Sequence, residues 1–219
     1  MPWDHPKFEI VPGKVAMLCI DVQNDFVVPG APYESEPARD AVDDLNDLFG
    51  LCREHGIPVV FTAHSHRPDG SDLGAVAYLH PLTASGDAMV EGSTGTELYP
   101  KLDVQGSDYI VHKRRFSAFY STDLELLLRN LGVDTVIIGG VATNVCCEST
   151  ARDAFFRDFK VIFLTDGNGT FDHPDVGWGA FPATDVQAHT LTNIRMYFGE
   201  VAGIEEVKDR IRAAGAAAE

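Results

Sequence analysis

The chain has 219 residues, and its 17 basic and 33 acidic side chains give a formal net charge of −16. This length suits one domain with a sizeable core, and 45% hydrophobic with 23% charged residues is typical of a globular protein. A chain this acidic would repel nucleic-acid phosphates and anionic membranes, and its sequence has no apolar run of the ~18–20 residues that a membrane span needs.

The N-terminal residues and the cysteines indicate the compartment. Residues 1–6 lack the basic and then apolar pattern of a signal peptide, so we expect a cytoplasmic protein. The four cysteines lack the spacing of a disulfide framework, and Cys146 and Cys147 are direct neighbours rather than a C-x-x-C redox pair. Cys19, in an apolar strand pattern, and Cys52, on the apolar stripe of a helix, are expected to be buried small hydrophobic residues.

Short apolar runs rich in β-branched residues predict the strands of a buried parallel sheet. In chain order they cover residues 15–20, 59–61, 109–111, 136–138 and 161–164, with a last strand near Val201. Apolar residues at helical spacing predict helices over residues 38–55, 123–130, 144–157, 185–197 and 204–213. Thr122 and Glu125 resemble a capping box at the start of the second of these helices.

Strands that alternate with helices predict an α/β fold of three layers, α/β/α, with a central parallel sheet of the Rossmann-like kind. We expect residues 1–219 to form a single domain, with an alanine-rich tail over 214–219 that frays. Segments 65–107 and 166–183 look irregular. Long loops in a compact domain are commonly lids or partner contacts, and the sequence leaves open which applies.

Three reactive side chains follow strands of this predicted sheet. Ligands bind beyond the carboxyl ends of the strands in an open α/β sheet. Asp21 follows the first strand, Lys113 follows the third, and Cys146 lies in the first turn of the helix after the fourth. A helix N-terminus and an ammonium group favour a thiolate, and a carboxylate can take the thiol proton. The sequence therefore predicts a cysteine nucleophile with Asp21 as base and the N–H groups of Ala142 and Cys146 as oxyanion hole.

Each of these side chains also has a simpler explanation. Asp21 could cap a loop, Lys113 could be a solvated surface charge, and Cys146 could be a core cysteine of an amphipathic helix. The residues by themselves leave both explanations open.

The motifs around these residues closely resemble those of the isochorismatase-like superfamily of cysteine hydrolases. They are Ile20 to Phe26 (IDVQNDF), Lys113 to Phe119 (KRRFSAF) followed by Thr122 to Leu124, and Gly140 to Ala154 (GVATNVCCESTARDA), within a resemblance over about residues 13–200. The resemblance implies the isochorismatase-like form of the fold and a catalytic triad of Asp21, Lys113 and Cys146. It also implies a non-proline cis peptide bond between Val141 and Ala142, and a homo-oligomer, either a dimer or a tetramer.

The histidines after the second strand raise the question of a metal. In nicotinamidases this region carries a metal site, and here it holds His64 and His66, with His80 downstream. The aspartate of that site is replaced in this chain, and the proline that directly follows its second histidine is displaced. We therefore expect no metal and no other cofactor, and we interpret the histidines as supporting the loop over 65–107. Zinc binding is the alternative, since imidazole is a common ligand of zinc.

The same motifs indicate which activity to expect. True isochorismatases lack the nucleophilic cysteine, so Cys146 argues against that reaction. The motifs look most like those of ureide-type members, which include ureidoacrylate, biuret, triuret and N-carbamoylsarcosine amidohydrolases. Their substrates share a terminal N–C(=O)–NH₂ unit, and attack by Cys146 on its carbonyl would expel ammonia and leave a thioester. The residues expected to contact this small substrate are Asn24, Phe26, Arg115, Phe116, Phe119 and Gln187.

Several roles keep an alternative. Arg115 either pairs with a substrate carboxylate or makes a structural ion pair, and Gln187 either contacts the ureide or faces solvent. Cys147 is expected to pack, with a redox role as the alternative. For the whole chain, the alternatives are a nicotinamidase-like or maleamate-like amidase and a non-catalytic small-molecule binding protein on the same fold. The retained triad argues against the binding protein, because a buried charged pair is costly to maintain.

Overall fold

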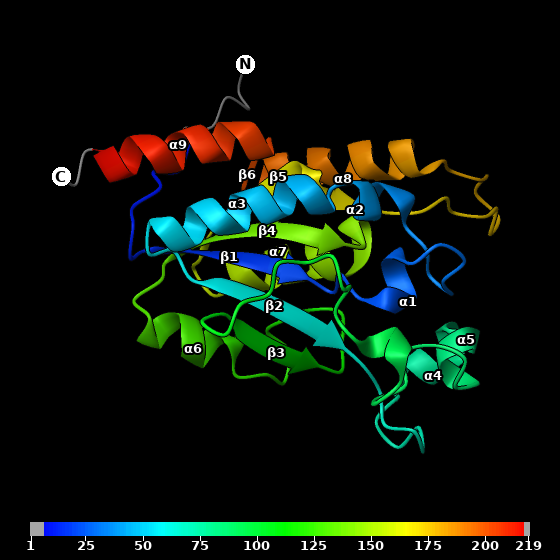
Figure 1. Ribbon diagram of the computed structural model, residues 1–219. Helices are drawn as coiled ribbons and strands as arrows, with labels where there is room; N and C mark the ends of the chain where they lie inside the picture. The colour runs from blue at the N-terminus through cyan, green and yellow to red at the C-terminus, as the bar shows by residue number, and fades with distance from the viewer. Residues whose placement is uncertain (1–6, 217–219) are drawn as a thin grey trace.

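A computed structural model describes residues 7–216 and places the strands in one parallel sheet with the order β3-β2-β1-β4-β5-β6 (Figure 1). The strands are β1 (Val15–Ile20), β2 (Val59–His64), β3 (Tyr109–Lys113), β4 (Thr135–Val141), β5 (Lys160–Gly169) and β6 (Glu200–Ala202). The predicted parallel sheet is confirmed. Residues 1–6, expected to lack a signal peptide, and residues 217–219 of the expected tail lie outside the described residues. Residues 214–216 of that tail do not fray but continue the last helix, Ile204–Ala216.

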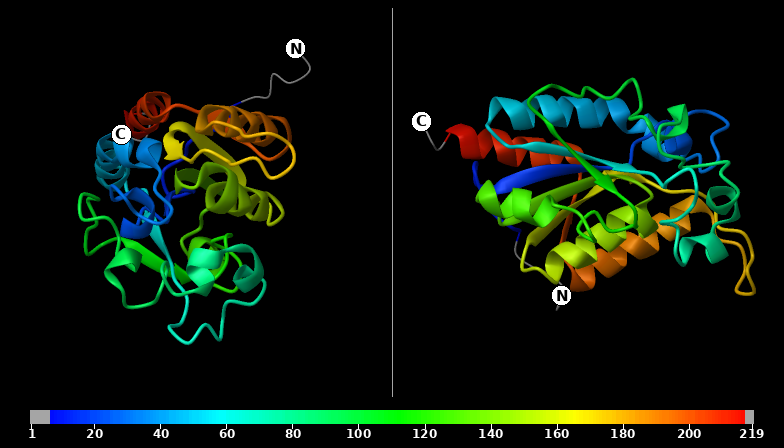
Figure 2. Two further views of the ribbon diagram at one scale, coloured as in Figure 1. Left: turned by 90° about the vertical axis from the view of Figure 1, so that its right-hand side faces the viewer. Right: turned by 90° about the horizontal axis from the view of Figure 1, so that it is seen from below.

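Helices cover both faces of the sheet, as the alternating pattern predicts. They are α1 (Asn24–Val27), α2 (Glu36–Asp40), α3 (Val42–Glu54), α4 (Val76–Leu79), α5 (Pro81–Ala84), α6 (Leu124–Asn130), α7 (Glu148–Phe155), α8 (Ala183–Tyr197) and α9 (Ile204–Ala216). Helices lie on both sides of the sheet (Figure 2). Side chains of α2, α3 and α9 belong to the core on one face, and side chains of α6, α7 and α8 to the core on the other. No helix within residues 7–216 is both long and apolar enough to cross a membrane.

Four local features differ from the sequence-based expectations. The predicted helix over 38–55 is divided at Ala41 into α2 and α3. The predicted helix over 144–157 begins as a π-helical turn, Thr143–Cys147, in which the Cys147 N–H donates to Ala142 O at 3.1 Å. Strand β5 continues to Gly169, inside the segment expected to be irregular. The capping box is absent from the described structure: the Thr122 hydroxyl accepts from the Leu124 N–H, and Glu125 pairs with arginine side chains instead.

The residues that follow β1 hold the irregular segment 65–107 over the carboxyl end of the sheet. The Gln23 side chain donates to the main-chain oxygens of His64 and Thr96 and accepts from the His64 N–H. The buried Asp25 carboxylate accepts from the Met89 N–H at 2.6 Å. These contacts place α4 and α5 at the end of the molecule toward which the arrows of β2, β3 and β4 point (Figure 1). Segment 65–107 is therefore positioned to cover whatever binds at that end.

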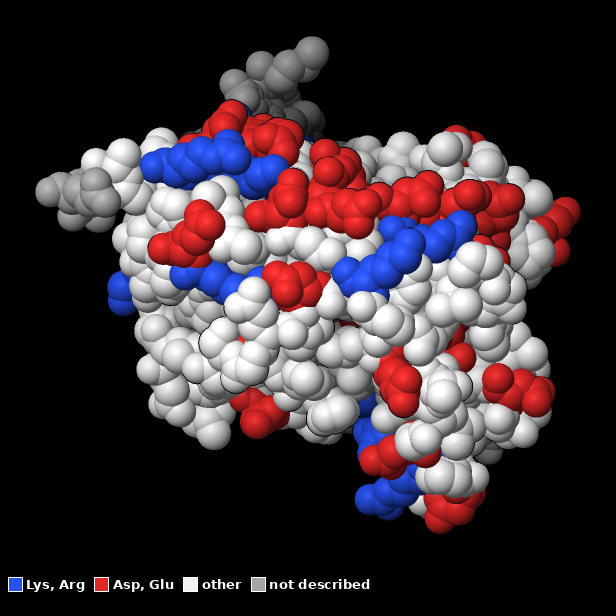
Figure 3. Space-filling view, viewed as in Figure 1, with Lys and Arg blue, Asp and Glu red and all other residues white. Residues whose placement is uncertain are grey.

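Acidic side chains gather on one face of the molecule. Figure 3 shows them as a band over α2 and α3, to which Asp40, Asp43, Asp44 and Asp47 contribute from exposed positions. This band agrees with the net charge of −16. An anion that approaches this face is repelled at low ionic strength.

Gly140 is a position at which the fold requires glycine. It has a φ of +126°, and a Cβ added there would overlap the backbone of Ile20 in the neighbouring strand β1. We expect Gly140→Ala to lower the free energy of unfolding by about 2–3 kcal/mol, measured by urea denaturation.

Gly50→Ala is the matched control. Apart from its own helix backbone and chain neighbours, a Cβ at Gly50 would meet no atom of residues 7–216 within 4 Å, and the residue lies inside helix α3, where alanine is the better helix former. Its stability should equal or slightly exceed that of the wild type. Equal stabilities of the Gly140 and Gly50 variants would contradict the close contact between β4 and β1.

Candidate active site

Asp21 is fixed directly beyond the end of β1. It is fully buried and has a positive φ of 50°. The Thr62 hydroxyl on β2 donates to Asp21 Oδ1 at 2.6 Å and accepts from the Asp21 N–H at 3.0 Å. The other carboxylate oxygen lies 2.7 Å from Lys113 Nζ, and neither side chain of this ion pair is exposed. A neighbouring strand thus orients the carboxylate toward the lysine.

Lys113, the last residue of β3, is surrounded by acceptors. Its ammonium donates to the main-chain oxygens of Arg115 at 2.9 Å and Phe116 at 3.0 Å, and it lies 3.4 Å from Cys146 Sγ. Burial alone would lower the pKa of Lys113, but attraction to Asp21 and to the Cys146 sulfur outweighs it, so the pKa lies above its usual value. The lysine is therefore charged, and its three protons are all in use.

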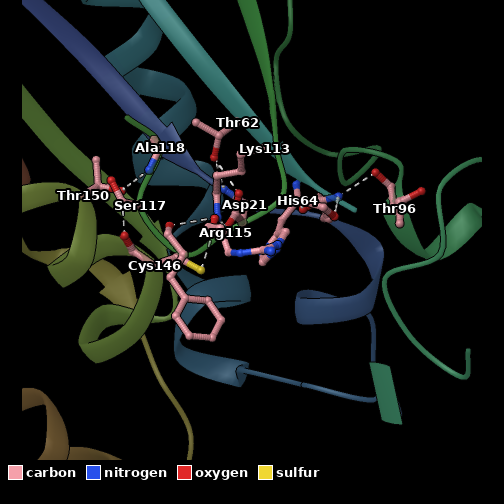
Figure 4. Close-up of polar contacts among 12 residues, drawn as sticks. Asp21, Thr62, His64, Thr96, Lys113, Arg115, Ser117, Ala118, Cys146 and Thr150 are labelled. Atoms are coloured by element: carbon pink, nitrogen blue, oxygen red, sulfur yellow. Dashed lines mark hydrogen bonds and ion pairs between the residues drawn. The ribbon is translucent and has the colours of Figure 1, made fainter. Parts of the chain in front are cut away.

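Cys146 lies in the turn after β4, and its sulfur is next to this ion pair (Figure 4). Its side chain is buried, and burial raises the pKa of the thiol to about 12, because the opposing effect of Lys113 is weakened by the nearby Asp21 charge. The expectation that the helix N-terminus and the lysine would favour a thiolate is thus not met at rest. The arrangement is a protonated thiol beside a carboxylate that can accept its proton.

A divalent metal does not fit among these groups. Ligand atoms of Asp21, His64 and Cys146 lie within 4.8 Å of one another, which satisfies the distances of a metal site. The Lys113 ammonium, however, lies 2.7 Å from the Asp21 oxygen and 3.4 Å from the Cys146 sulfur. A second cation at this point would be repelled, because like charges at such distances interact strongly away from water.

A small cavity opens next to the Cys146 sulfur. Its lining residues come from the strand ends and from the segments that cover them: Phe26, Tyr33, His64, His66, Val76, His80, Thr83, Met89, Phe116, Ala142, Val145, Cys146 and Phe171. The cavity volume is about 70 Å³, so a group bound in this form must be small. Within the described residues 7–216 the lining contains no lysine, arginine, aspartate or glutamate.

The polar groups of the lining are mainly imidazoles. In the part of the chain that the structure describes, no ring nitrogen of His64 or His66 makes a hydrogen bond, although His66 Nδ1 lies 3.4 Å from the Asp72 carboxylate. Burial lowers the pKa of both, and for His64 the Lys113 charge lowers it further, so both rings are neutral at neutral pH. The hydroxyls of Tyr33 and Thr83 bond to each other at 2.8 Å.

The structure brings some of the expected site residues together and not others. Phe26, Phe116 and Ala142 line the cavity beside the thiol, and the Val141–Ala142 peptide bond is cis. Asn24 lies outside the lining, because its amide donates to the Thr94 main-chain oxygen at 2.7 Å and helps to hold the covering segment.

Three further residues expected to contact substrate also lie outside the lining. The Arg115 guanidinium donates to main-chain oxygens, among them Asp72 O at 2.9 Å, and does not line the cavity. Phe119 is a buried core residue that packs on the Phe159 ring at 5.6 Å. The Gln187 amide donates to the main-chain oxygens at the end of β5, including Thr165 O at 3.1 Å. Cys147, expected to pack, is fully buried in the core.

Other lining residues lie in no motif that singles them out. They are Tyr33, Val76, Thr83, Met89 and Phe171. Val145 also lines the cavity and lies within the cysteine motif, but the motif assigns it no contact. Val76 and Met89 belong to segment 65–107, and Phe171 to segment 166–183, which the sequence identifies only as irregular. The available signal was the length of these two loops, which indicates a lid but not the side chains that face the cavity.

Similar proteins are known at the level of family, sequence and fold. Residues 15–206 match the family model of the isochorismatase domain. The chain is 36% identical over 159 residues to nicotinamidase 3 of Arabidopsis thaliana, covering 72% of this chain and 74% of that protein. It is 27% identical over 222 residues to the ureidoacrylate amidohydrolase of Klebsiella pneumoniae, covering 94% and 90%. A cysteine hydrolase structure from Pseudomonas syringae has a TM-score of 0.92 at 38% identity, covering 96% and 99%.

The protonated state of Cys146 can be measured by alkylation. Because its pKa is about 12, we expect the rate with iodoacetamide to keep rising, roughly tenfold per pH unit, from about pH 7 to about pH 10. Glutathione in the same sample, an ordinary thiol, should level off above about pH 9. Peptide mass spectrometry assigns the product to Cys146. A plateau at Cys146 below about pH 9 would show a stabilised thiolate instead.

Proposed function

The chain belongs to the isochorismatase family and is a hydrolase, and we propose that it releases ammonia from a small ureide or carbamoyl amide through a thioester on Cys146. The observation that carries the proposal is the buried contact among the Cys146 thiol, the Lys113 ammonium and the Asp21 carboxylate at the end of a small cavity. The ureide class is supported by the lysine and cysteine motifs and by the similarity to a ureidoacrylate amidohydrolase over 94% of the chain.

The first half of the reaction would use Asp21 as a proton carrier. A substrate carbonyl beside Cys146 accepts the sulfur while Asp21 takes the thiol proton, which forms a tetrahedral intermediate with a negative oxygen. The N–H groups of Ala142 and Cys146 are the proposed donors to that oxygen. Collapse of the intermediate returns the proton from Asp21 to the leaving nitrogen, so that ammonia departs and a carbamoyl thioester remains.

The second half would run the same proton transfer with water. Asp21 takes a proton from a water molecule that attacks the thioester, and the thiol leaves with a proton as the carbamate or carboxylate is released. Lys113 keeps the carboxylate in place throughout, and its charge also favours the sulfur anion when the proton has moved. These steps as proposed need no metal, and the Lys113 ammonium would repel a divalent ion placed between Asp21 and Cys146.

A nicotinamidase-like amidase is the second candidate. It is favoured by the 36% identity to nicotinamidase 3 and by the uncharged, mainly apolar lining of the cavity. In that case the same three residues would act on a carboxamide carried by a ring.

Ammonia release from a panel of amides tests the proposed function. The panel contains biuret, triuret, ureidoacrylate, N-carbamoylsarcosine, maleamate and nicotinamide, assayed with and without chelator. We expect turnover of a ureide that chelator leaves unchanged and that Cys146→Ala lowers by at least ~10³-fold.

Cys147→Ala is the matched control for this experiment, because it removes the neighbouring thiol from the core rather than from the cavity. It should retain most of the activity. Turnover of nicotinamide alone would select the second candidate, and a wild-type protein inactive on the whole panel and inert to iodoacetamide would favour the non-catalytic binding protein.

Thr62 is expected to act as a positioning residue for Asp21. Thr62→Val removes the hydroxyl that donates to the carboxylate at 2.6 Å, a bond to a charged group worth about 1.5–3 kcal/mol. We expect kcat to fall roughly tenfold to a hundredfold with KM nearly unchanged, and the pH profile of kcat to shift. Thr62→Ser keeps the hydroxyl and should restore most of kcat. Equal loss in both variants would point to packing rather than to the hydrogen bond.

A further inference from the structure

We propose that the cavity beside Cys146 selects uncharged amides and rejects amides that carry a carboxylate, an inference that rests on the proposed function. Within the ureide class, it assigns the site to biuret- and triuret-like molecules rather than to ureidoacrylate-like ones.

The lining that the structure describes supplies no permanent positive charge that could neutralise a bound carboxylate. Over the described residues 7–216 it holds no lysine or arginine, its only titratable nitrogens are those of His64, His66 and His80, and most of its surface is apolar. Moving an ionised carboxylate from water into such surroundings is costly unless a cation pairs with it. An uncharged ureide would lose far less solvation on entering the same cavity.

The lysine and arginine side chains near the cavity already pair with carboxylates or donate to main-chain oxygens of the protein. Lys113 is paired with Asp21 and donates to two main-chain oxygens besides the sulfur. Arg114 contacts Ser65, Asp72 and Glu91. The Arg115 guanidinium is held by main-chain oxygens outside the lining. A substrate carboxylate would have to break one of these sets of contacts in order to find a partner.

The hydrogen-bonding groups that do face the cavity suit an uncharged ligand. A neutral imidazole can donate through one nitrogen and accept through the other, which complements the N–H and C=O groups of a ureide. His64 and His66 offer such nitrogens, which find no hydrogen bond within the part of the chain that is described. Protonating either ring to meet a carboxylate would be unfavourable, because burial holds the pKa of both below the usual value.

A pair of alkylating reagents of nearly equal size tests this inference without requiring turnover. Iodoacetamide and iodoacetate differ in the amide or carboxylate that would occupy the cavity as Cys146 is alkylated. The selectivity is the ratio of the two rates at Cys146, divided by the same ratio for glutathione, so the state of the thiol cancels. Measurement in about 0.5 M salt screens the acidic surface. We expect a selectivity for iodoacetamide of roughly tenfold or more, whereas a value near or below one would overturn the proposal.

A cation placed in the lining should weaken the preference. Val76→Lys puts an ammonium on α4 at a position that lines the cavity, and we expect the selectivity for iodoacetamide to fall toward one. Leu79→Lys is the matched control, since it adds the same charge to the same helix at a residue that is 74% exposed and outside the lining. It should leave the selectivity at the wild-type value. Equal shifts in both variants would contradict selection inside the cavity, and thermal denaturation checks that each variant is folded.

Arg115→Gln tests independently whether this arginine contributes a positive charge to the cavity. Because Arg115 lies outside the lining, its loss should not change the rate with iodoacetate. A fall of several-fold in that rate would show that the arginine reaches the cavity and binds anions, which would overturn the proposal. The ammonia assays test the proposed function independently of the charge preference. If the protein is selective for iodoacetamide but hydrolyses no amide, the charge preference stands and the proposed function is rejected.

Discussion

The Asp21–Lys113 ion pair is the contact on which the rest of the site depends. Both side chains are fully buried and 2.7 Å apart, so each would be strongly destabilising without the other. The sheet order makes the pair possible, because β2 lies between β1 and β3 and contributes Thr62 to the same carboxylate. Strand β4, on the other side of β1, leads into the turn with Cys146. Four adjacent strand ends therefore build one site, at the place where the sheet reverses its strand order.

The ion pair also explains the state of the thiol. A charged lysine next to Cys146 would favour a thiolate, but the lysine is neutralised by Asp21, and burial then dominates. The sequence shows a helix N-terminus and a lysine near the cysteine, and on that basis predicts an activated thiolate. It does not show how far water is excluded, which depends on the segments that fold over the strand ends.

The fold and the convergence of Asp21, Lys113 and Cys146 follow from patterns that are local in sequence. Apolar runs locate the strands, and the rule that ligands bind at their carboxyl ends brings the three residues together before any motif is considered. The cavity could not be predicted in this way, because residues such as Met89 and Phe171 reach it from long loops. The sequence leaves open whether Arg115 pairs with a substrate carboxylate or makes a structural ion pair, and the main-chain oxygens that hold it are visible only in three dimensions.

The way in which segment 65–107 is attached bears on how the site can evolve. Gln23, Asn24 and Asp25 hold this segment through its main-chain groups, at Thr96, Thr94 and Met89 respectively, and not through its side chains. A change of side chain at these three anchor positions leaves the main-chain groups in place, whereas a side chain at Gly95 would overlap the Asp25 carboxylate. Mutation can exchange the side chains that the segment contributes to the cavity while the catalytic groups below stay in place. The substrate range of this fold can therefore change by mutation of the covering segment while the catalytic residues stay the same.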